Sequence, residues 1–126
     1  MIIRSLSSRP EFTAGDGTTL RELLHGPKDG LPCRYSLAHA RLAPGQASFL
    51  HRLATCEVYY ILAGRGRMEI DGEIRGVSEG DAIYIPPGAA QRITNSGSDD
   101  LAFLCIVDPA WREEDEEIVQ ADKPTS

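Results

Sequence analysis

The sequence predicts an all-β chain folded as an antiparallel sandwich or barrel. Turn signals recur about every 8 to 15 residues from residue 35 onward. The segments between the turns are short, and they either alternate in polarity or are rich in β-branched and aromatic residues. No long helical pattern interrupts them. Many short strands joined by regularly spaced turns are typical of two-layered or closed antiparallel folds.

Composition limits the classes of function. A chain of 126 residues fits one domain, and 41% hydrophobic with 25% charged residues is typical of a soluble globular protein. The net charge of -6 argues against a nucleic-acid partner, which calls for a basic face, and against a membrane surface. The N-terminus has too short an apolar stretch for a signal peptide, so we expect a cytoplasmic location. The three cysteines lack metal-finger spacing and are expected to be free thiols.

The first part of the chain carries weaker signals. Asp16-Gly17 marks a turn. Residues 18–24 fit either a short capped helix or a strand, and residues 26–32 are rich in Gly and Pro, as loops are. We expect residues 1–34 to be an extension that packs on or beside a barrel.

Seven later segments carry strand patterns and end at turns. They are residues 35–42, 58–62, 67–70, 73–77, 82–85, 91–95 and 101–107. Asp71-Gly72 between two of these segments is a strong hairpin signal. We expect residues 35–109 to form one barrel domain.

The composition changes after Pro109 and becomes strongly acidic. A run of like charges is typical of a solvated segment. We expect residues 110–126 to form a surface segment with a helical turn, in which Trp111 folds back onto the barrel. Residues 121–126 are expected to be disordered.

Two gapped motifs organise the middle of the chain. The first is made of Gly45, His51, Glu57 and Gly64, and the second of Gly80, Pro86, Gly88 and Asn95. Both spacings resemble the two motifs of the cupin family. The resemblance covers about residues 36–108. It implies a jelly-roll barrel, also called a double-stranded β-helix.

The resemblance also implies a metal site, from which this chain departs. Cupins of this kind hold a divalent metal with three histidines and a glutamate inside the barrel mouth. Here His51 and Glu57 match, Leu53 stands in place of one histidine, and Gln91 stands in place of another. With the Gln91 amide oxygen as third ligand, the set suits Zn, Mn, Fe(II) or Ni. Alternatively, His51 and Glu57 hydrogen-bond each other or Gln91 without a metal.

Two further side chains, His39 and Tyr59, are candidates. His39 lies on the strand before the first motif, where it either replaces a missing metal ligand or packs within the sheet. Tyr59 shares strand parity with Glu57, so it either lines the cavity and orients a substrate through its hydroxyl, or is a core aromatic residue whose hydroxyl reaches the barrel end. His25 lies beside a loop and is expected to be exposed.

Two classes of function follow. The first is a cupin that binds a divalent metal and a small organic ligand in the barrel, as a metal-dependent enzyme of the dioxygenase, isomerase or lyase type. The alternative is a non-catalytic cupin that binds a sugar or small acid without metal, or keeps the fold without a working site. Exposed sheet edges need covering, so we expect a homodimer with N-terminal residues and Trp111 in its interface.

Overall fold

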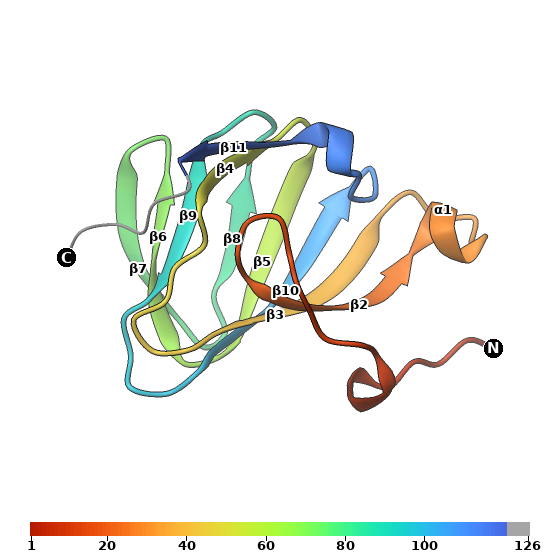
Figure 1. The fold of residues 1–126 in the computed structure, drawn as a ribbon, viewed down its shortest axis with the longest axis horizontal. Coiled ribbons are helices and arrows are strands. Elements are labelled where there is room, and N and C mark those ends of the chain that lie inside the picture. Colours follow the sequence, from red (N-terminus) through yellow and green to blue (C-terminus); the bar gives the residue numbers. More distant parts are fainter. Residues whose placement is uncertain (121–126) are drawn as a thin grey trace.

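The computed structural model describes residues 1–120, and it consists of two antiparallel sheets packed face to face (Figure 1). Six strands form the first sheet in the order β1-β2-β3-β10-β5-β8, and five form the second in the order β11-β4-β9-β6-β7. Neighbours in both sheets are mostly distant in sequence, as in a jelly roll. The predicted all-β jelly-roll fold is therefore confirmed. Residues 121–126, expected to be disordered, lie outside the described residues.

The first sheet is built around its longest strands. Its members are β1 (Phe12–Thr13), β2 (Thr19–His25), β3 (Ser36–Leu42), β10 (Leu101–Asp108), β5 (Cys56–Ala63) and β8 (Ala82–Ile85). β10 lies between β3 and β5 and pairs with both along most of its length. The segment that fitted either a helix or a strand is strand β2, because its backbone pairs with β3. Short helical turns at Leu6–Ser8 (η1) and Gly26–Asp29 (α1) flank this strand pair.

The second sheet contains a strand that sequence analysis did not predict. Its members are β11 (Glu116–Gln120), β4 (Leu50–Leu53), β9 (Gln91–Asn95), β6 (Arg65–Ile70) and β7 (Glu73–Ser78). The predicted helical turn is η2 at Glu113–Asp115, and the acidic residues after it extend as β11 beside β4 (Figure 1). The edge of β4 offers unpaired backbone groups, and pairing with them outweighs the low strand propensity of glutamate.

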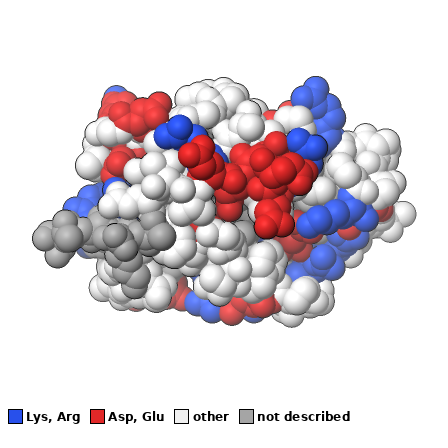
Figure 2. Space-filling model, turned by 45° about the horizontal axis from the view of Figure 1, so that its top comes forward, with Lys and Arg blue, Asp and Glu red and all other residues white. Residues whose placement is uncertain are grey.

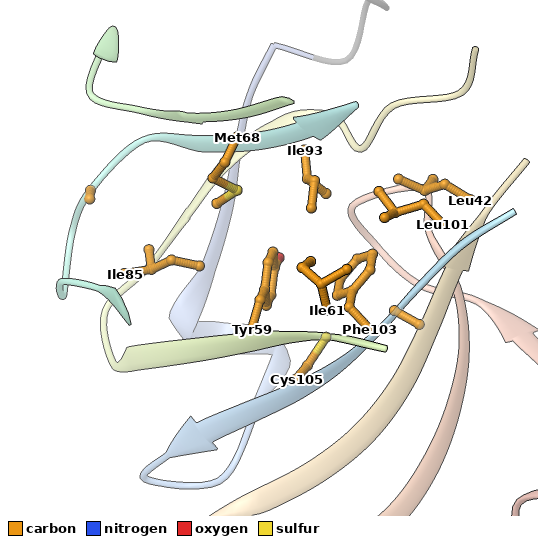
Figure 3. Close-up of a cluster of buried hydrophobic side chains, with 11 residues drawn as sticks. Leu42, Tyr59, Ile61, Met68, Ile85, Ile93, Leu101, Phe103 and Cys105 are labelled. Carbon is orange, nitrogen blue, oxygen red and sulfur yellow. The ribbon is translucent and has the colours of Figure 1, made fainter. Parts of the chain in front are cut away.

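The hydrophobic core lies between the sheets (Figure 3). Ile61, Ile93 and Leu101 are fully buried there. The rings of Tyr59 and Phe103 are 4.7 Å apart between centroids, at an interplanar angle of 45°. Both aromatic residues also line the cavity described below, so the core forms the floor of that cavity.

Gly64 of the first motif has a conformational role. Its φ is +83°, and a Cβ placed there would lie 2.6 Å from the carbonyl oxygen of Asp100. A side chain would therefore meet both an unfavourable backbone angle and a backbone clash. This glycine lets β5 turn into β6 directly beneath the start of β10. None of the described helices is long and apolar enough to cross a membrane.

Candidate functional site

A cavity of about 280 Å³ lies between the two sheets. Its walls are mainly apolar and aromatic, and they include Phe12, Leu20, Leu53, Tyr59, Phe103 and Trp111. Polar side chains also line it, among them Asp16, His51, Glu57 and Glu116. These four come from four separate parts of the chain, namely the β1–β2 turn, β4, β5 and β11. A mostly apolar cavity with a few convergent polar groups is the usual form of a small-molecule site.

His51 is buried and held by both ring nitrogens. Its Nδ1 lies 2.7 Å from the carbonyl oxygen of Phe49, and a carbonyl only accepts, so Nδ1 donates this hydrogen bond. Nε2 lies 3.4 Å from Oδ2 of Asp16. That contact is attractive only when Nε2 also carries a proton or shares one with the carboxylate. His51 and Asp16 therefore act as a linked pair at the cavity wall.

Asp16 is a site residue that sequence analysis treated only as part of a turn. Its Oδ1 accepts hydrogen bonds from the backbone nitrogen of Thr18 at 3.0 Å and from the Thr18 hydroxyl at 2.7 Å, which leaves Oδ2 to face His51. The backbone oxygen of Asp16 accepts from the nitrogen of Phe49 at 2.7 Å. This last hydrogen bond holds the β1–β2 turn against the residue that precedes β4. No local pattern could have revealed it.

Glu57 and Gln91 form the second polar pair. Gln91 Nε2 donates to Glu57 Oε1 at 2.9 Å, while Gln91 Oε1 is buried without a hydrogen-bond partner among residues 1–120. Burial raises the pKa of Glu57 from 4.5 to about 8; the Gln91 hydrogen bond opposes this, and the carboxylates of Asp16 and Glu116 add to it. The Glu57 carboxyl is therefore mostly protonated at neutral pH.

Tyr59 is placed where both of its predicted roles require it. It is 1% exposed, it packs on Phe103, and it lines the cavity. Burial, and after it the neighbouring Glu57, raises the pKa of the Tyr59 hydroxyl well above its ordinary value. The phenol therefore stays protonated and can act as a hydrogen-bond donor.

The structure does not bring His39 to the cavity. The residues of β3 that line the cavity are Ser36 and Ala38, and His39 has the opposite strand parity. Its register neighbours are Arg21 on β2 and Leu104 on β10. Partial burial lowers the pKa of His39, and the positive charges of Arg21 and Arg41 lower it further. His39 thus lies on the outer face of the first sheet.

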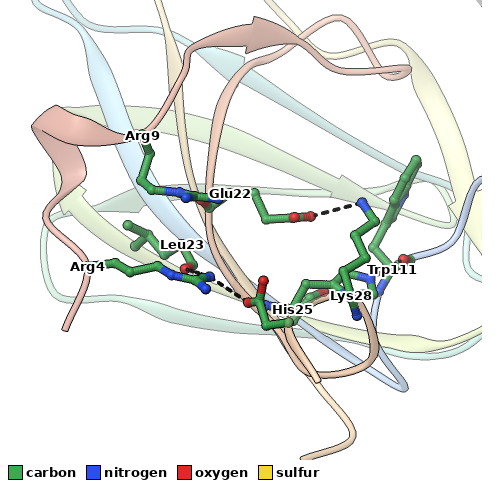
Figure 4. Close-up of polar contacts among 9 residues, drawn as sticks. Arg4, Arg9, Glu22, Leu23, His25, Lys28 and Trp111 are labelled. Carbon is green, nitrogen blue, oxygen red and sulfur yellow. Dashed lines mark hydrogen bonds and ion pairs between the residues drawn. The ribbon is translucent and has the colours of Figure 1, made fainter. Parts of the chain in front are cut away.

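The expectation that His25 is exposed was wrong, since it is 3% exposed. Its Nδ1 accepts from the backbone nitrogen of Lys28 at 3.1 Å, so Nε2 donates to the carbonyl oxygen of Trp111 at 2.8 Å. His25 caps the short turn α1 and fixes the chain at Trp111 (Figure 4). Its partner Trp111 is remote in sequence, so the loop composition around His25 could not predict that this side chain is buried.

The C-terminal segment closes one side of the cavity. Trp111 Nε1 donates to Glu116 Oε2 at 3.3 Å, and both side chains line the wall. Burial raises the pKa of Glu116, and the nearby Asp16 carboxylate adds to the increase. Lys28 Nζ lies 5.8 Å from the centre of the Trp111 ring and 3.5 Å from Glu22 Oε2 (Figure 4). Figure 2 shows acidic side chains gathered on the face that carries β11.

The polar groups, as arranged, do not fit a divalent metal. Gln91 turns its NH₂ group toward Glu57, and Glu57 is mostly protonated at neutral pH. Leu53 lines the cavity and offers no ligand. Within residues 1–120, no three His, Cys, Asp or Glu side chains lie close enough together to hold an ion. Metal ligands must be deprotonated and convergent.

Comparison with known proteins identifies relatives along most of the chain. The cupin domain model matches residues 38–107. An uncharacterized protein of Methanocaldococcus jannaschii is 43% identical over 110 residues, which cover 86% of this chain and 87% of that protein. An oxalate-binding protein of Thermotoga maritima is 34% identical over 114 residues, covering 85% of this chain and 93% of the relative.

Solved structures agree with this relationship. The crystal structure of a predicted oxalate decarboxylase from Thermotoga maritima superimposes with a TM-score of 0.74 at 26% identity, covering 86% of this chain and 99% of that one. Oxalate decarboxylase from Bacillus subtilis gives a TM-score of 0.78 at 24% identity, which shows the fold alone; the match covers 92% of this chain and 31% of that one. The two motifs, the jelly-roll topology and these matches together show that the chain belongs to the cupin family.

Proposed function

We propose that this protein binds a small organic molecule in the barrel cavity and holds it by hydrogen bonds and charge. One observation carries the proposal: a cavity of about 280 Å³ with aromatic walls is lined by Asp16, His51, Glu57 and Glu116, which come from four distant parts of the chain. The Thermotoga maritima relative, named an oxalate-binding protein, also supports a small-molecule ligand.

The chemistry of the wall suits orientation rather than bond breaking. Glu57 in its protonated form can donate one hydrogen bond and accept another, and the Tyr59 hydroxyl can do the same. Asp16 and His51 supply a polar pair held rigidly by the backbone of Phe49. Rigid polar groups on apolar walls give affinity with little loss of ordering entropy.

The proposal is tested by blocking the cavity. Ala38 faces the cavity from β3, so Ala38→Phe fills it, whereas Ala102→Phe places the same ring on the opposite face of neighbouring β10. A set of small sugars, carboxylates and amines is screened by ligand-observed NMR against the parent protein and both variants, after circular dichroism shows that each is folded. We expect binding that Ala38→Phe abolishes and Ala102→Phe keeps. Ligands that bind all three proteins equally would refute a cavity site.

A metal-dependent enzyme of the dioxygenase, isomerase or lyase type is the second candidate. One observation favours it: Gln91 Oε1 is buried without a hydrogen-bond partner among the described residues. Because the polar groups as arranged do not fit a divalent metal, this candidate requires Glu57 to lose its proton when the metal binds. Mass spectrometry of untagged protein purified without chelators tests this candidate. A stoichiometric transition metal would support the metal-dependent enzyme. Folded protein without a metal would support the metal-free binding function.

We also propose a homodimer, with an interface on the outer face of the first sheet. Tyr60, Tyr84 and Ile106 are exposed there by 42%, 61% and 38%. Val58 is the register partner of both Tyr84 and Ile106, so one apolar row crosses β8, β5 and β10. Contiguous apolar surface of this kind marks association sites. This face replaces Trp111 as expected interface material, because Trp111 lines the cavity.

Light scattering at micromolar concentration tests the dimer. Tyr84→Lys should convert a dimeric mass to a monomeric one, and Ile74→Lys, on the exposed strand β7 of the other sheet, should not. A monomeric parent protein would contradict the proposal. The cytoplasmic location stays a prediction.

A further inference from the structure

We infer that the cavity ligand is a small organic cation, a protonated amine carried on an aromatic or apolar body. This inference rests on the proposed binding function and names the class of ligand.

The charge of the cavity wall is the first argument. Asp16, Glu57 and Glu116 all line the cavity, and within the described residues none of them has a Lys or Arg nitrogen within 4.0 Å. His51 is the basic partner of Asp16 alone. The one lysine of the wall, Lys28, is 56% exposed at the side chain and faces Glu22. The interior of the cavity therefore holds carboxyl groups that have no lysine or arginine partner among residues 1–120.

The burial of Glu57 gives the second argument. It is 6% exposed and lines the cavity, with Gln91 as the donor to one of its oxygens and no basic partner in the part of the chain described. Ionising a carboxyl group that is removed from water and has no cationic partner is costly. A ligand ammonium group in the cavity would provide the missing partner and allow the carboxyl to be charged.

The aromatic wall gives the third argument. Phe12, Tyr59, Phe103 and Trp111 line the same cavity as the carboxyl groups. Aromatic faces attract ammonium groups within about 6 Å of the ring centre, by about 0.5 to 2 kcal/mol. Lys28 Nζ already occupies such a position over Trp111, at 5.8 Å. The wall thus combines apolar contact for a ligand body with two kinds of group that favour a positive charge.

The same features disfavour an anion such as oxalate, which the name of the Thermotoga maritima relative suggests. A carboxylate placed about 5 Å from one ionised wall carboxylate would be repelled by about 3 kcal/mol at an effective dielectric constant of about 20. Oxalate carries two such charges and would face both Asp16 and Glu116. Within the lining set, the cations available to offset this are Lys28 at the exposed edge and His51, which already faces Asp16.

The test uses four probes with the intact protein: benzylamine, benzyl alcohol, benzoate and oxalate. Benzylamine, benzyl alcohol and benzoate share one ring and differ mainly in charge. Calorimetry gives the affinities at pH 7, and the Ala38→Phe variant shows whether binding occurs in the cavity. We expect benzylamine to bind about tenfold or more tightly than benzyl alcohol, which corresponds to about 1.4 kcal/mol, and the two anions to bind most weakly.

A matched pair of variants adds a second readout. Glu116→Gln removes a carboxyl group from the wall, and Glu79→Gln removes one from an exposed position outside the cavity. Glu116→Gln should weaken benzylamine several-fold and leave benzyl alcohol unchanged, while Glu79→Gln should change neither. If benzoate or oxalate binds more tightly than benzylamine, and Ala38→Phe abolishes that binding, the ligand is not a cation but the cavity is still a binding site. If no probe or library ligand binds in the cavity, both are overturned.

Discussion

Glu57→Gln should remove a pH-dependent loss of stability. The folded protein keeps the Glu57 carboxyl protonated up to a pKa of about 8, whereas in the unfolded chain the carboxyl ionises near its ordinary value of 4.5. Between these two values the folded state binds the extra proton, so the free energy of unfolding falls as the pH rises. Glutamine has nearly the shape of a protonated glutamate, and its oxygen can still accept from Gln91 Nε2.

The magnitude follows from the two pKa values. Each unit of pH between them is worth about 1.4 kcal/mol, so the full effect is about 5 kcal/mol at most. Relaxation of the fold around the ionised group reduces this, and we expect about 3 kcal/mol between pH 5 and pH 8. The variant should match the parent protein near pH 5 and exceed it increasingly toward pH 8. The other titrating groups facing Glu57, at Asp16 and Glu116, are common to both proteins and cancel to first order.

Urea unfolding at pH 5, 6.5 and 8 measures this difference, with Glu79→Gln as the control for loss of an exposed carboxyl group. A difference between Glu57→Gln and the parent protein that stays constant from pH 5 to pH 8 would refute the raised pKa. It would also show that water or a charge partner reaches Glu57 in solution.

Three further predictions concern single side chains. His25→Ala should lower the free energy of unfolding by about 2 kcal/mol, because it leaves the partly buried Trp111 carbonyl without its donor; urea unfolding measures this. Gly64→Ala should cost more than about 2 kcal/mol, and Gly80→Ala about 1 kcal/mol, because both have positive φ but only Gly64 meets backbone atoms; thermal unfolding ranks the two. Gln91→His should gain affinity for Zn or Ni in calorimetry and lose it below about pH 6, because an imidazole must shed its proton to bind a metal.

Each of these three has an outcome that contradicts it. His39→Ala removes a histidine from the outer face of the first sheet. If it lowers the free energy of unfolding as much as His25→Ala does, the hydrogen bonds of His25 contribute nothing specific to stability. Equal costs at Gly64 and Gly80 would mean that the close approach to Asp100 is not limiting. A Gln91→His variant that gains no metal would mean that the cavity is unsuited to metal even with an added imidazole.

Much of the fold was readable from sequence because its signals are local. Alternation along a strand and the residues of a tight turn depend on a few neighbouring positions, and they indicated an all-β chain before any contact was known. The two motifs placed His51, Glu57 and Gln91 inside the barrel, and strand parity added Tyr59; all four side chains are buried. The pattern of residues 18–24 was ambiguous because pairing with β3, rather than local propensity, makes that segment a strand.

The character of the site, by contrast, was decided by tertiary structure. Asp16 reaches His51 because a backbone hydrogen bond holds its turn against Phe49, and Glu116 joins the wall because the edge of β4 recruits an acidic segment as a strand. The protonated state of Glu57 exists only because the closed barrel excludes water from it. Burial, and pairing between residues far apart in sequence, are properties of the packed chain. The sequence by itself therefore determined the barrel and its inward faces, while only the tertiary structure decided which charges share the cavity.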